Sequence, residues 1–232
     1  MLLHAERLAA SGASPTKAVL FLHGILGSGG NLRGQARPFL EAHPDFLAVL
    51  VDLRAHGQSL GEEGPDTVES AAADLAQTAR TWPVPVHTVV GHSFGGKVAL
   101  AFGRLCPDVA AVMTLDSVPG RRLPGRRSET AWQVLDLLAS MPGPWPTRDA
   151  FVAQVEEHGF SRGLSQWLAM NLARHPEGFK FRLELSRIRA LIDDYYQVDL
   201  WSVVEAAARS RQGPRFHLVI GSRSNMYVPE DR

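Results

Sequence analysis

The chain has a single cysteine, no net charge and no long apolar run, and each absence excludes a class of protein. Cys106 alone can form neither an intrachain disulfide nor a cysteine-ligated zinc site. Lys and Arg number 24 and Asp and Glu number 24, so the chain lacks the basic excess of a dedicated nucleic-acid binder. No apolar run approaches the roughly 18 residues of a membrane span. The N-terminus carries His4, Glu6 and Arg7 where a signal peptide needs an unbroken apolar core. We therefore expect a cytoplasmic protein with no nucleic-acid or membrane partner.

Short apolar runs separated by helical segments indicate an α/β fold with a mostly parallel sheet. The 232 residues are 45% hydrophobic and 21% charged, which is typical of a globular chain able to bury a core. Thr67–Arg80 and Lys97–Leu105 have helical spacing of apolar residues. Runs rich in valine and leucine, without polar alternation, are typical of strands covered on both faces. The predicted strands are Ala18–Leu22, Phe46–Val51, Val86–Val90, Val109–Leu115 and Phe216–Ile220.

A long segment interrupts this alternation and predicts a helical cap. Residues 121–212 contain no convincing strand, and their aromatic side chains lie on helical-looking stretches. Insertions of this length in α/β domains are usually functional, typically covering a site. We therefore predict a core of residues 1–120 and 213–232, with a cap of residues 121–212 inserted after the strand that ends near Leu115. The alternative for the aromatics is that they form only the cap's own core.

A small basic cluster stands at the start of the predicted cap. We interpret it as a solvated loop, and recognition of an anionic substrate tail is the alternative. The cluster consists of Arg121, Arg122, Arg126 and Arg127.

The third predicted strand leads directly into Gly91-His92-Ser93-Phe94-Gly95, and a helix follows. The pattern G-x-S-x-G in this context places a serine on a sharp strand-to-helix turn, with its hydroxyl exposed at the carboxyl edge of the sheet. Such a turn forces a positive φ on the serine, and the flanking glycines leave room for the backbone. Ser93 is therefore the candidate nucleophile, with Gly91, His92 and Gly95 as supporting residues. The alternative is a glycine-rich turn with an incidental serine.

A second turn, His23-Gly24-Ile25-Leu26-Gly27, follows the first predicted strand. Acyl transfer needs N–H donors for the oxyanion, and removing one costs a factor of roughly 10²–10³ in rate. One donor belongs to the residue after the nucleophile, here Phe94, and another to the loop after an earlier strand. We assign the second donor to Ile25. His23 and Gly24 are expected to shape the loop, and His23 is not expected to act as a base.

Several motifs follow one another in a recognisable order. They are Phe21-Leu22-His23-Gly24 with Gly27-Ser28 and Asn31-Leu32, then Asp52-Leu53-Arg54-Ala55-His56-Gly57-Gln58-Ser59, Gly91-His92-Ser93-Phe94-Gly95-Gly96-Lys97, and Leu115-Asp116-Ser117-Val118-Pro119. From about Lys17 onward, the chain resembles the α/β-hydrolase superfamily, and more narrowly the YbfF-type esterases and the abhydrolase domain-containing 11 proteins. The resemblance implies a serine hydrolase of short or medium acyl esters or acyl thioesters. It also implies an acyl-enzyme on Ser93, a helical cap, and neither cofactor nor metal.

A serine triad also needs a carboxylate that orients the histidine. In much of the superfamily this acid follows the strand after the cap, but Asn225 stands where the pattern D-x-x-V-P would place it. The esterase group named above uses the aspartate at the end of the strand before the cap, which implies Asp116. A turn-capping role is the alternative for Asp116. The rival carboxylate, Asp52, is interpreted as part of a structural loop network.

The triad histidine is missing from its expected place after the last strand. The chain has nine histidines, and none follows that strand. His217 lies within the strand and is expected to pack against a helix, while His158 and His175 belong to the cap and are poor substitutes.

The final residues, Pro229-Glu230-Asp231-Arg232, are typical of a helix start that the sequence does not continue. We therefore expect a C-terminally incomplete hydrolase core with little turnover alone, weak stability and an exposed sheet edge that favours association. A non-catalytic ligand-binding protein on the same fold is the alternative. A dehalogenase or epoxide hydrolase is disfavoured, because those enzymes resemble this fold but carry an aspartate in place of Ser93.

Overall fold

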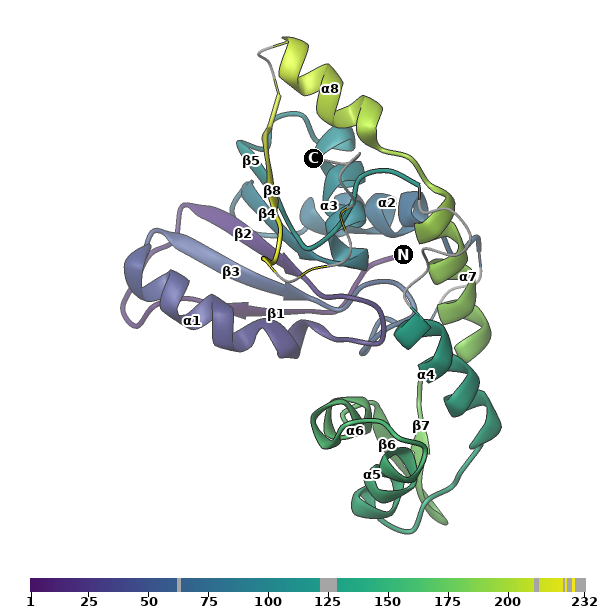
Figure 1. The fold of residues 1–232 in the computed structure, drawn as a ribbon. Helices are drawn as coiled ribbons and strands as arrows, with labels where there is room; N and C mark the ends of the chain where they lie inside the picture. Colours follow the sequence, from purple (N-terminus) through teal and green to yellow (C-terminus); the bar gives the residue numbers. More distant parts are fainter. Residues whose placement is uncertain (62–63, 122–128, 211–212, 223, 225–226, 228–232) are drawn as a thin grey trace.

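The computed structural model describes residues 1–61, 64–121, 129–210, 213–222, 224 and 227. Within them, a six-stranded sheet forms the centre of the molecule (Figure 1). β1 runs antiparallel to β3, and the other neighbouring strands are parallel. The strands, in spatial order, are β1 (Ala5–Leu8), β3 (Phe46–Val51), β2 (Lys17–Leu22), β4 (Val86–His92), β5 (Ala111–Leu115) and β8 (Arg215–Val219). The expected mostly parallel sheet is confirmed.

Helices cover both faces of the central strands. A short 3₁₀ helix, η1 (Gly29–Leu32), leads into α1 (Arg33–Ala42), which packs on one face of β2 and β3. On the other face lie α2 (Val68–Ala79) and α3 (Phe94–Leu105). All six residues of β3 are buried, because the strand is central and covered on both sides. The apolar run over β3 therefore reflects burial on both faces, as the sequence pattern predicted.

Within the described residues, the edge strand β8 is covered on only one face, whereas its apolar run predicted cover on both. Arg215, His217 and Val219 are exposed, while Phe216 and Leu218 are half-buried. Phe216 lies against Gly103 of α3, so one face of β8 meets a helix and the other does not. The expectation that His217 packs against a helix is wrong, since no helix among the described residues covers its face of the strand.

The segment between β5 and β8 contains helices and also a hairpin. Its elements are α4 (Glu129–Ser140), α5 (Arg148–Glu157), α6 (Arg162–Ala169), β6 (Leu172–His175), β7 (Gly178–Phe181), α7 (Leu185–Gln197) and α8 (Trp201–Ser210). The expectation that this segment contains no strand is wrong, because β6 and β7 pair antiparallel. Each has only four residues, which is too short for an alternating pattern to stand out in the sequence.

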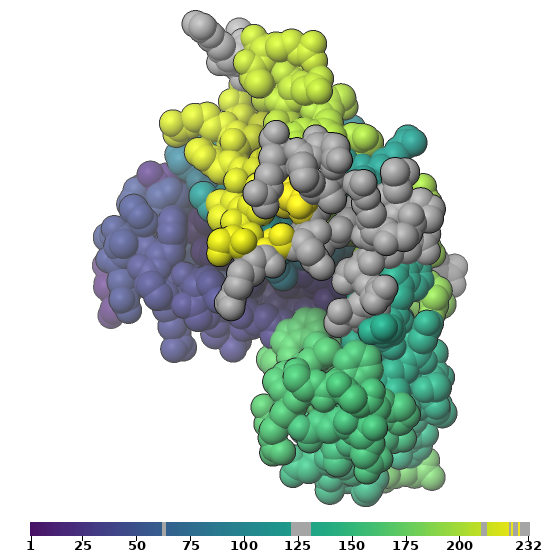
Figure 2. Space-filling model, viewed as in Figure 1, coloured from purple at the N-terminus to yellow at the C-terminus, as the bar shows by residue number. Residues whose placement is uncertain are grey.

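The inserted segment leaves the core and returns to it. α5, α6 and the hairpin form a lobe set apart from the sheet, and α4 and α7 connect this lobe to the core (Figure 1). Figure 2 shows the lobe as a protrusion, with a hollow where it meets the core. α8 packs against α3, so the last helix of the segment lies on the core. Arg121 is exposed, and the other arginines of the basic cluster fall outside the described residues. No described helix is long and apolar enough to cross a membrane.

Candidate active site

Ser93 stands on the tight turn between β4 and α3. Its backbone has φ 51° and ψ −116°, the positive φ expected from the sequence pattern. A Cβ on Gly91 would lie 2.1 Å from the carbonyl oxygen of Gly95. A Cβ on Gly95 would lie 2.6 Å from the carbonyl oxygens of Leu22 and His23. The turn therefore fits only if both flanking positions are glycine.

Backbone strain is concentrated at the carboxyl edge of the sheet. In the described chain, four residues other than glycine have a positive φ: Leu26, Ala55, Ser93 and Asp116. They follow β2, β3, β4 and β5, respectively. Such conformations cost about 1–3 kcal/mol each and cluster at functional sites, where the surrounding structure maintains them. This edge is therefore the best candidate for a reactive centre.

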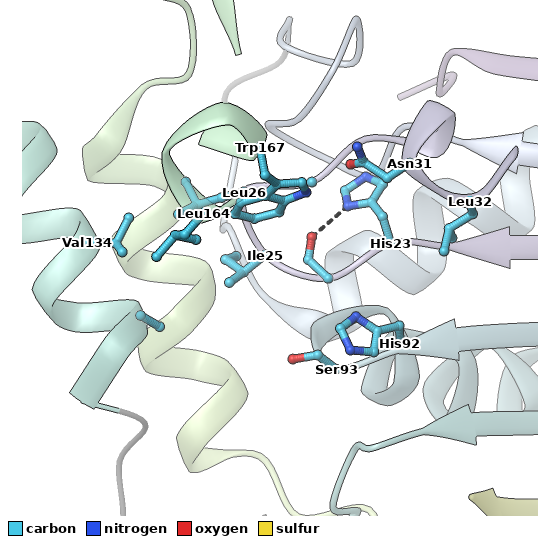
Figure 3. Close-up of a pocket in the computed structure, with 13 residues that line it drawn as sticks. His23, Ile25, Leu26, Asn31, Leu32, His92, Ser93, Val134, Leu164 and Trp167 are labelled. Atoms are coloured by element: carbon cyan, nitrogen blue, oxygen red, sulfur yellow. Dashed lines mark hydrogen bonds between the residues drawn. The ribbon is translucent and has the colours of Figure 1, made fainter. Parts of the chain in front are cut away.

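Two buried imidazole rings shape the loop after β2. His23 donates from Nδ1 to the carbonyl of Gly24 (2.7 Å) and accepts at Nε2 from the N–H of Leu53 (3.0 Å). The Nδ1 bond is drawn in Figure 3. Burial lowers the pKa of His23 to about 4. A neutral ring that is fully engaged with the backbone positions the loop, as predicted, and has no free nitrogen with which to act as a base.

His56 makes the same kind of contact with the loop: the sequence placed it in the structural loop network near Asp52, but its bond to Leu26 was not foreseen. Its Nε2 accepts from the N–H of Leu26 (3.0 Å), and Nδ1 donates to the carbonyl of Arg54 (2.8 Å). Burial, reinforced by the neighbouring ring of His23, lowers the pKa of His56 to about 3. Both rings are therefore neutral acceptors near pH 7.

The structure brings the two predicted oxyanion donors to Ser93. Ile25, Ser93 and Phe94 line a small cavity of about 80 Å³, together with Tyr195 and Tyr196 of α7. Phe94 is the first residue of α3, so its N–H has no acceptor within the helix. The N–H of Ile25 likewise has no hydrogen-bond acceptor among the described residues. Both donors are therefore available for a ligand atom beside Ser93.

Ser93 and Ile25 also line a second, larger cavity. It has a volume of about 330 Å³ and lies between the loop after β2 and the inserted helices. Trp167 and Leu164 of α6, with Val134 of α4, form the wall contributed by the inserted segment (Figure 3). The hydroxyl of Ser93 points away from the ring of His92 (Figure 3). Leu26 also lines this cavity, and the walls are mostly apolar.

Asp116 ends β5 at the same edge of the sheet. Its N–H donates to the carbonyl of Val219 (2.8 Å), and its Oδ1 accepts from the N–H of Gly221 at 3.4 Å. The carboxylate therefore faces the loop that follows β8. Asn225, which occupies the other position considered for the acid, lies outside the described residues.

No histidine of the chain completes a triad in this structure. All nine are described, and none is hydrogen-bonded to the hydroxyl of Ser93 or to the carboxylate of Asp116. His92 is the nearest in sequence, and burial lowers its pKa while the charge of Asp116 opposes that shift. Its ring lies instead against Gly24.

Asp52 forms the structural network that the sequence suggested. Its carboxylate accepts from the N–H groups of Gly29 (2.8 Å) and Gln58 (2.9 Å). It also pairs with Nδ1 of His4 at 3.1 Å. These bonds hold η1 and the loop after β3 to the sheet, so this carboxylate is committed to the backbone.

Comparisons with known proteins agree with this architecture. A family model described as alpha/beta hydrolase fold matches residues 17–182. The sn-1-specific diacylglycerol lipase ABHD11 of Mus musculus is 27% identical over 187 residues, which are 78% of this chain and 60% of that protein. Esterase YbfF of Escherichia coli (strain K12) is 30% identical over 102 residues, 44% of this chain and 39% of that protein. The chain thus spans less than two thirds of the length of these curated relatives.

A solved structure also matches nearly the whole chain. The structure titled "Marine microorganism esterase" superimposes with a TM-score of 0.81 at 23% sequence identity, covering 99% of this chain and 84% of that one. At this identity the match concerns the fold.

Proposed function

We propose that this chain, which belongs to the α/β-hydrolase fold family, carries the nucleophile of a serine hydrolase that cleaves carboxylic esters or acyl thioesters. The observation that carries the proposal is the position of Ser93. It stands on a strained turn and lines two apolar cavities, beside two N–H groups that are available to an oxyanion. Relatives named as an esterase and as a lipase support an ester as the substrate.

The proposed reaction has two steps. The hydroxyl oxygen of Ser93 attacks the acyl carbon, and a histidine takes the hydroxyl proton. The carbonyl oxygen becomes an oxyanion that accepts hydrogen bonds from the N–H groups of Ile25 and Phe94. The intermediate then collapses, and the alcohol or thiol leaves with the proton returned by the histidine. Water releases the acid from the acyl-enzyme by the same route, with the same histidine as base.

The described chain places no histidine in hydrogen-bonding contact with the Ser93 hydroxyl to accept the proton. We propose that a histidine beside Asp116 takes this role, because the carboxylate faces the loop after β8 and its bond to Gly221 is long. Residues encoded past Arg232 are tested for it below. In subtilisin, removing the triad histidine costs a factor of roughly 10⁶ in turnover. We therefore propose that this chain alone turns over substrate very slowly.

The cavities indicate the substrate class. A volume of about 330 Å³ lies at the lower end of the ~300–1,000 Å³ typical of small-molecule sites. Its apolar wall fits a short or medium hydrocarbon chain, whereas the cavity of about 80 Å³ fits only a compact group. We propose that the inserted segment acts as the cap that closes both cavities over Ser93, and that no cofactor is required.

A fluorophosphonate probe tests the proposal, because it labels only a serine whose hydroxyl is activated. The test compares this chain with a gene product that continues past Arg232. We expect the longer product to be labelled, Ser93→Ala to abolish labelling, and Asp116→Asn to slow it by up to about 10⁴-fold. Ser11→Ala is the control, since Ser11 is exposed and lies between β1 and β2, at the opposite edge of the sheet from Ser93.

The same experiment separates the proposed hydrolase from a ligand-binding protein on this fold. If the longer product is not labelled, yet medium-chain fatty acids still quench the fluorescence of Trp167, the hydrolase assignment is wrong and the binding function is supported. Trp167→Phe identifies the contribution of that indole to the signal.

A further inference from the structure

The residue that follows the proposed oxyanion donor is held from two sides. Leu26 is 2% exposed and has φ 61°. Its N–H donates to Nε2 of His56 (3.0 Å), and its carbonyl accepts from Nδ2 of Asn171 (2.8 Å). A positive φ is unfavourable for leucine, so contacts outside the loop must maintain it. These two bonds act on the peptide groups on either side of Leu26 and keep the bend that places Ile25 beside Ser93.

The two anchors come from different parts of the chain. His56 belongs to the core loop after β3, whereas Asn171 lies 145 residues after Leu26, at the junction of α6 and β6. Asn171 is 3% exposed. Its own N–H donates to Leu168 (2.9 Å), and its carbonyl accepts from Arg182 (3.0 Å). The backbone of Asn171 is therefore held by the lobe, while its side chain reaches the core.

The junction that carries Asn171 is fixed within the lobe. Arg148 of α5 donates from Nη1 to the carbonyl of Ala169 and from Nη2 to the carbonyl of Leu172. One guanidinium thus ties the end of α6 and the start of β6 to α5. The Asn171 amide is therefore fixed to the lobe. Its distance from the Leu26 carbonyl depends on how the lobe packs against the core.

We propose that Asn171 is a positioning residue that couples the seating of the cap to the shape of the oxyanion loop. When the α6–β6 junction packs against the loop after β2, which we call the seated position, the Leu26 carbonyl has its donor and the loop keeps its bend. When the junction lifts, that carbonyl loses its partner and the loop relaxes. The catalytic meaning of this coupling rests on the proposed function: Ser93 reaches full reactivity only with the cap seated. By linkage, a ligand held at the oxyanion loop stabilises the seated cap.

Hydrogen exchange of the loop tests the coupling without requiring activity. The Leu26 and Gly27 amides are both hydrogen-bonded, so their exchange reports the bend. We expect Asn171→Leu to speed exchange in a peptide that covers this loop at least tenfold, with β2 and β3 unchanged. Gln166→Leu is the matched control, because it replaces an exposed amide on α6 with the same apolar side chain.

If Asn171 only stabilises the lobe, hydrogen exchange gives a different pattern. In that case Asn171→Leu would speed exchange in α5, α6 and the hairpin but leave the loop as in the parent chain, and this result would overturn the proposal. Should the leucine variant fail to fold, Asn171→Ser provides the same comparison, because the shorter side chain cannot span the distance to the Leu26 carbonyl.

Fluorophosphonate labelling gives the catalytic readout in the longer gene product. We expect Asn171→Leu to lower the labelling rate of Ser93 by about 10–100-fold, up to the effect of losing one oxyanion donor, and Gln166→Leu to leave it unchanged. An unlabelled parent would count against the proposed function alone. The exchange experiment would still decide for or against the coupling.

Discussion

At the scale of single residues, the two buried imidazoles make stability depend on pH. His23 and His56 accept backbone N–H groups and stay neutral in the folded chain, because burial lowers their pKa values to about 4 and about 3. In the unfolded chain each titrates near its ordinary value of about 6.5. The unfolded state therefore binds more protons below that pH, so the free energy of unfolding decreases as the pH falls from about 6.5 toward 4.

We predict a loss on the order of 1 kcal/mol per pH unit for each ring over this window, measured by urea denaturation between pH 7 and pH 4.5. His56→Gln is expected to be less stable at pH 7 but to have a shallower dependence on pH. His158→Gln is the control, since His158 is exposed at the end of α5. A His56→Gln variant with the same slope as the parent would show that His56 does not titrate in this way.

At the scale of elements, α3 anchors both ends of the inserted segment through one side chain. Lys97 is fully buried, and its Nζ donates to the carbonyls of Gly120 (2.7 Å), Tyr195 (2.6 Å) and Val198 (2.9 Å). Gly120 lies where the chain leaves the core after β5, and the other two lie at the end of α7, where it returns. The ammonium also lies 4.7 Å from the centroid of the Tyr195 ring. The helix that follows Ser93 therefore also holds the inserted segment in place.

We predict that Lys97→Met lowers the free energy of unfolding by about 2–4 kcal/mol, because buried carbonyls lose their donor while the side-chain volume is nearly kept. Urea denaturation at pH 7 measures this loss. Lys180→Met is the matched control, since Lys180 is exposed on β7 and its replacement should change stability by less than about 0.5 kcal/mol. Equal effects of the two substitutions would contradict the anchoring role.

The sequence predicted the elements whose burial or backbone geometry requires a strong pattern of apolar residues or glycines. β2 and β3 are buried along their length and therefore appear as apolar runs, and the Ser93 turn is specified by its two glycines. β1 has a charged centre, Glu6-Arg7, and β6 and β7 are too short to show alternation. β8 was found as a strand, but its exposed face was not foreseen, because an apolar run does not show which faces a helix covers.

The candidate site was likewise predictable only where its contacts are local. Ile25, Ser93, Phe94 and Asp116 follow strand ends, and a parallel sheet gathers such ends at one edge. Asn171 could not be assigned from the sequence, since its contact with Leu26 bridges 145 residues and depends on how the lobe sits on the core. His56 was recognised as part of a motif, but its bond to Leu26 requires the loops after β2 and β3 to face each other.

At the scale of the whole molecule, the sheet is covered unevenly. α1 and its neighbours cover one face at β2 and β3. Toward β5 and β8 the described chain places no helix on that face, and Val219 is 45% exposed. β8 also pairs only with β5 among the described strands, so no described strand pairs with its other edge. Exposed, partly apolar edge strands favour pairing between chains, and charged side chains there oppose it.

We therefore predict that the chain associates reversibly through β8, with a second copy as the partner. Sedimentation velocity between about 5 and 200 µM should show a weight-average sedimentation coefficient that rises with concentration. Val219→Lys should weaken this association several-fold, because it places a charge on the uncovered face beside Arg215 and His217. Leu105→Lys is the matched control: Leu105 is also 45% exposed but lies at the end of α3, away from this face. A monomer at every concentration, or equal effects of the two lysines, would show that β8 is not the contact.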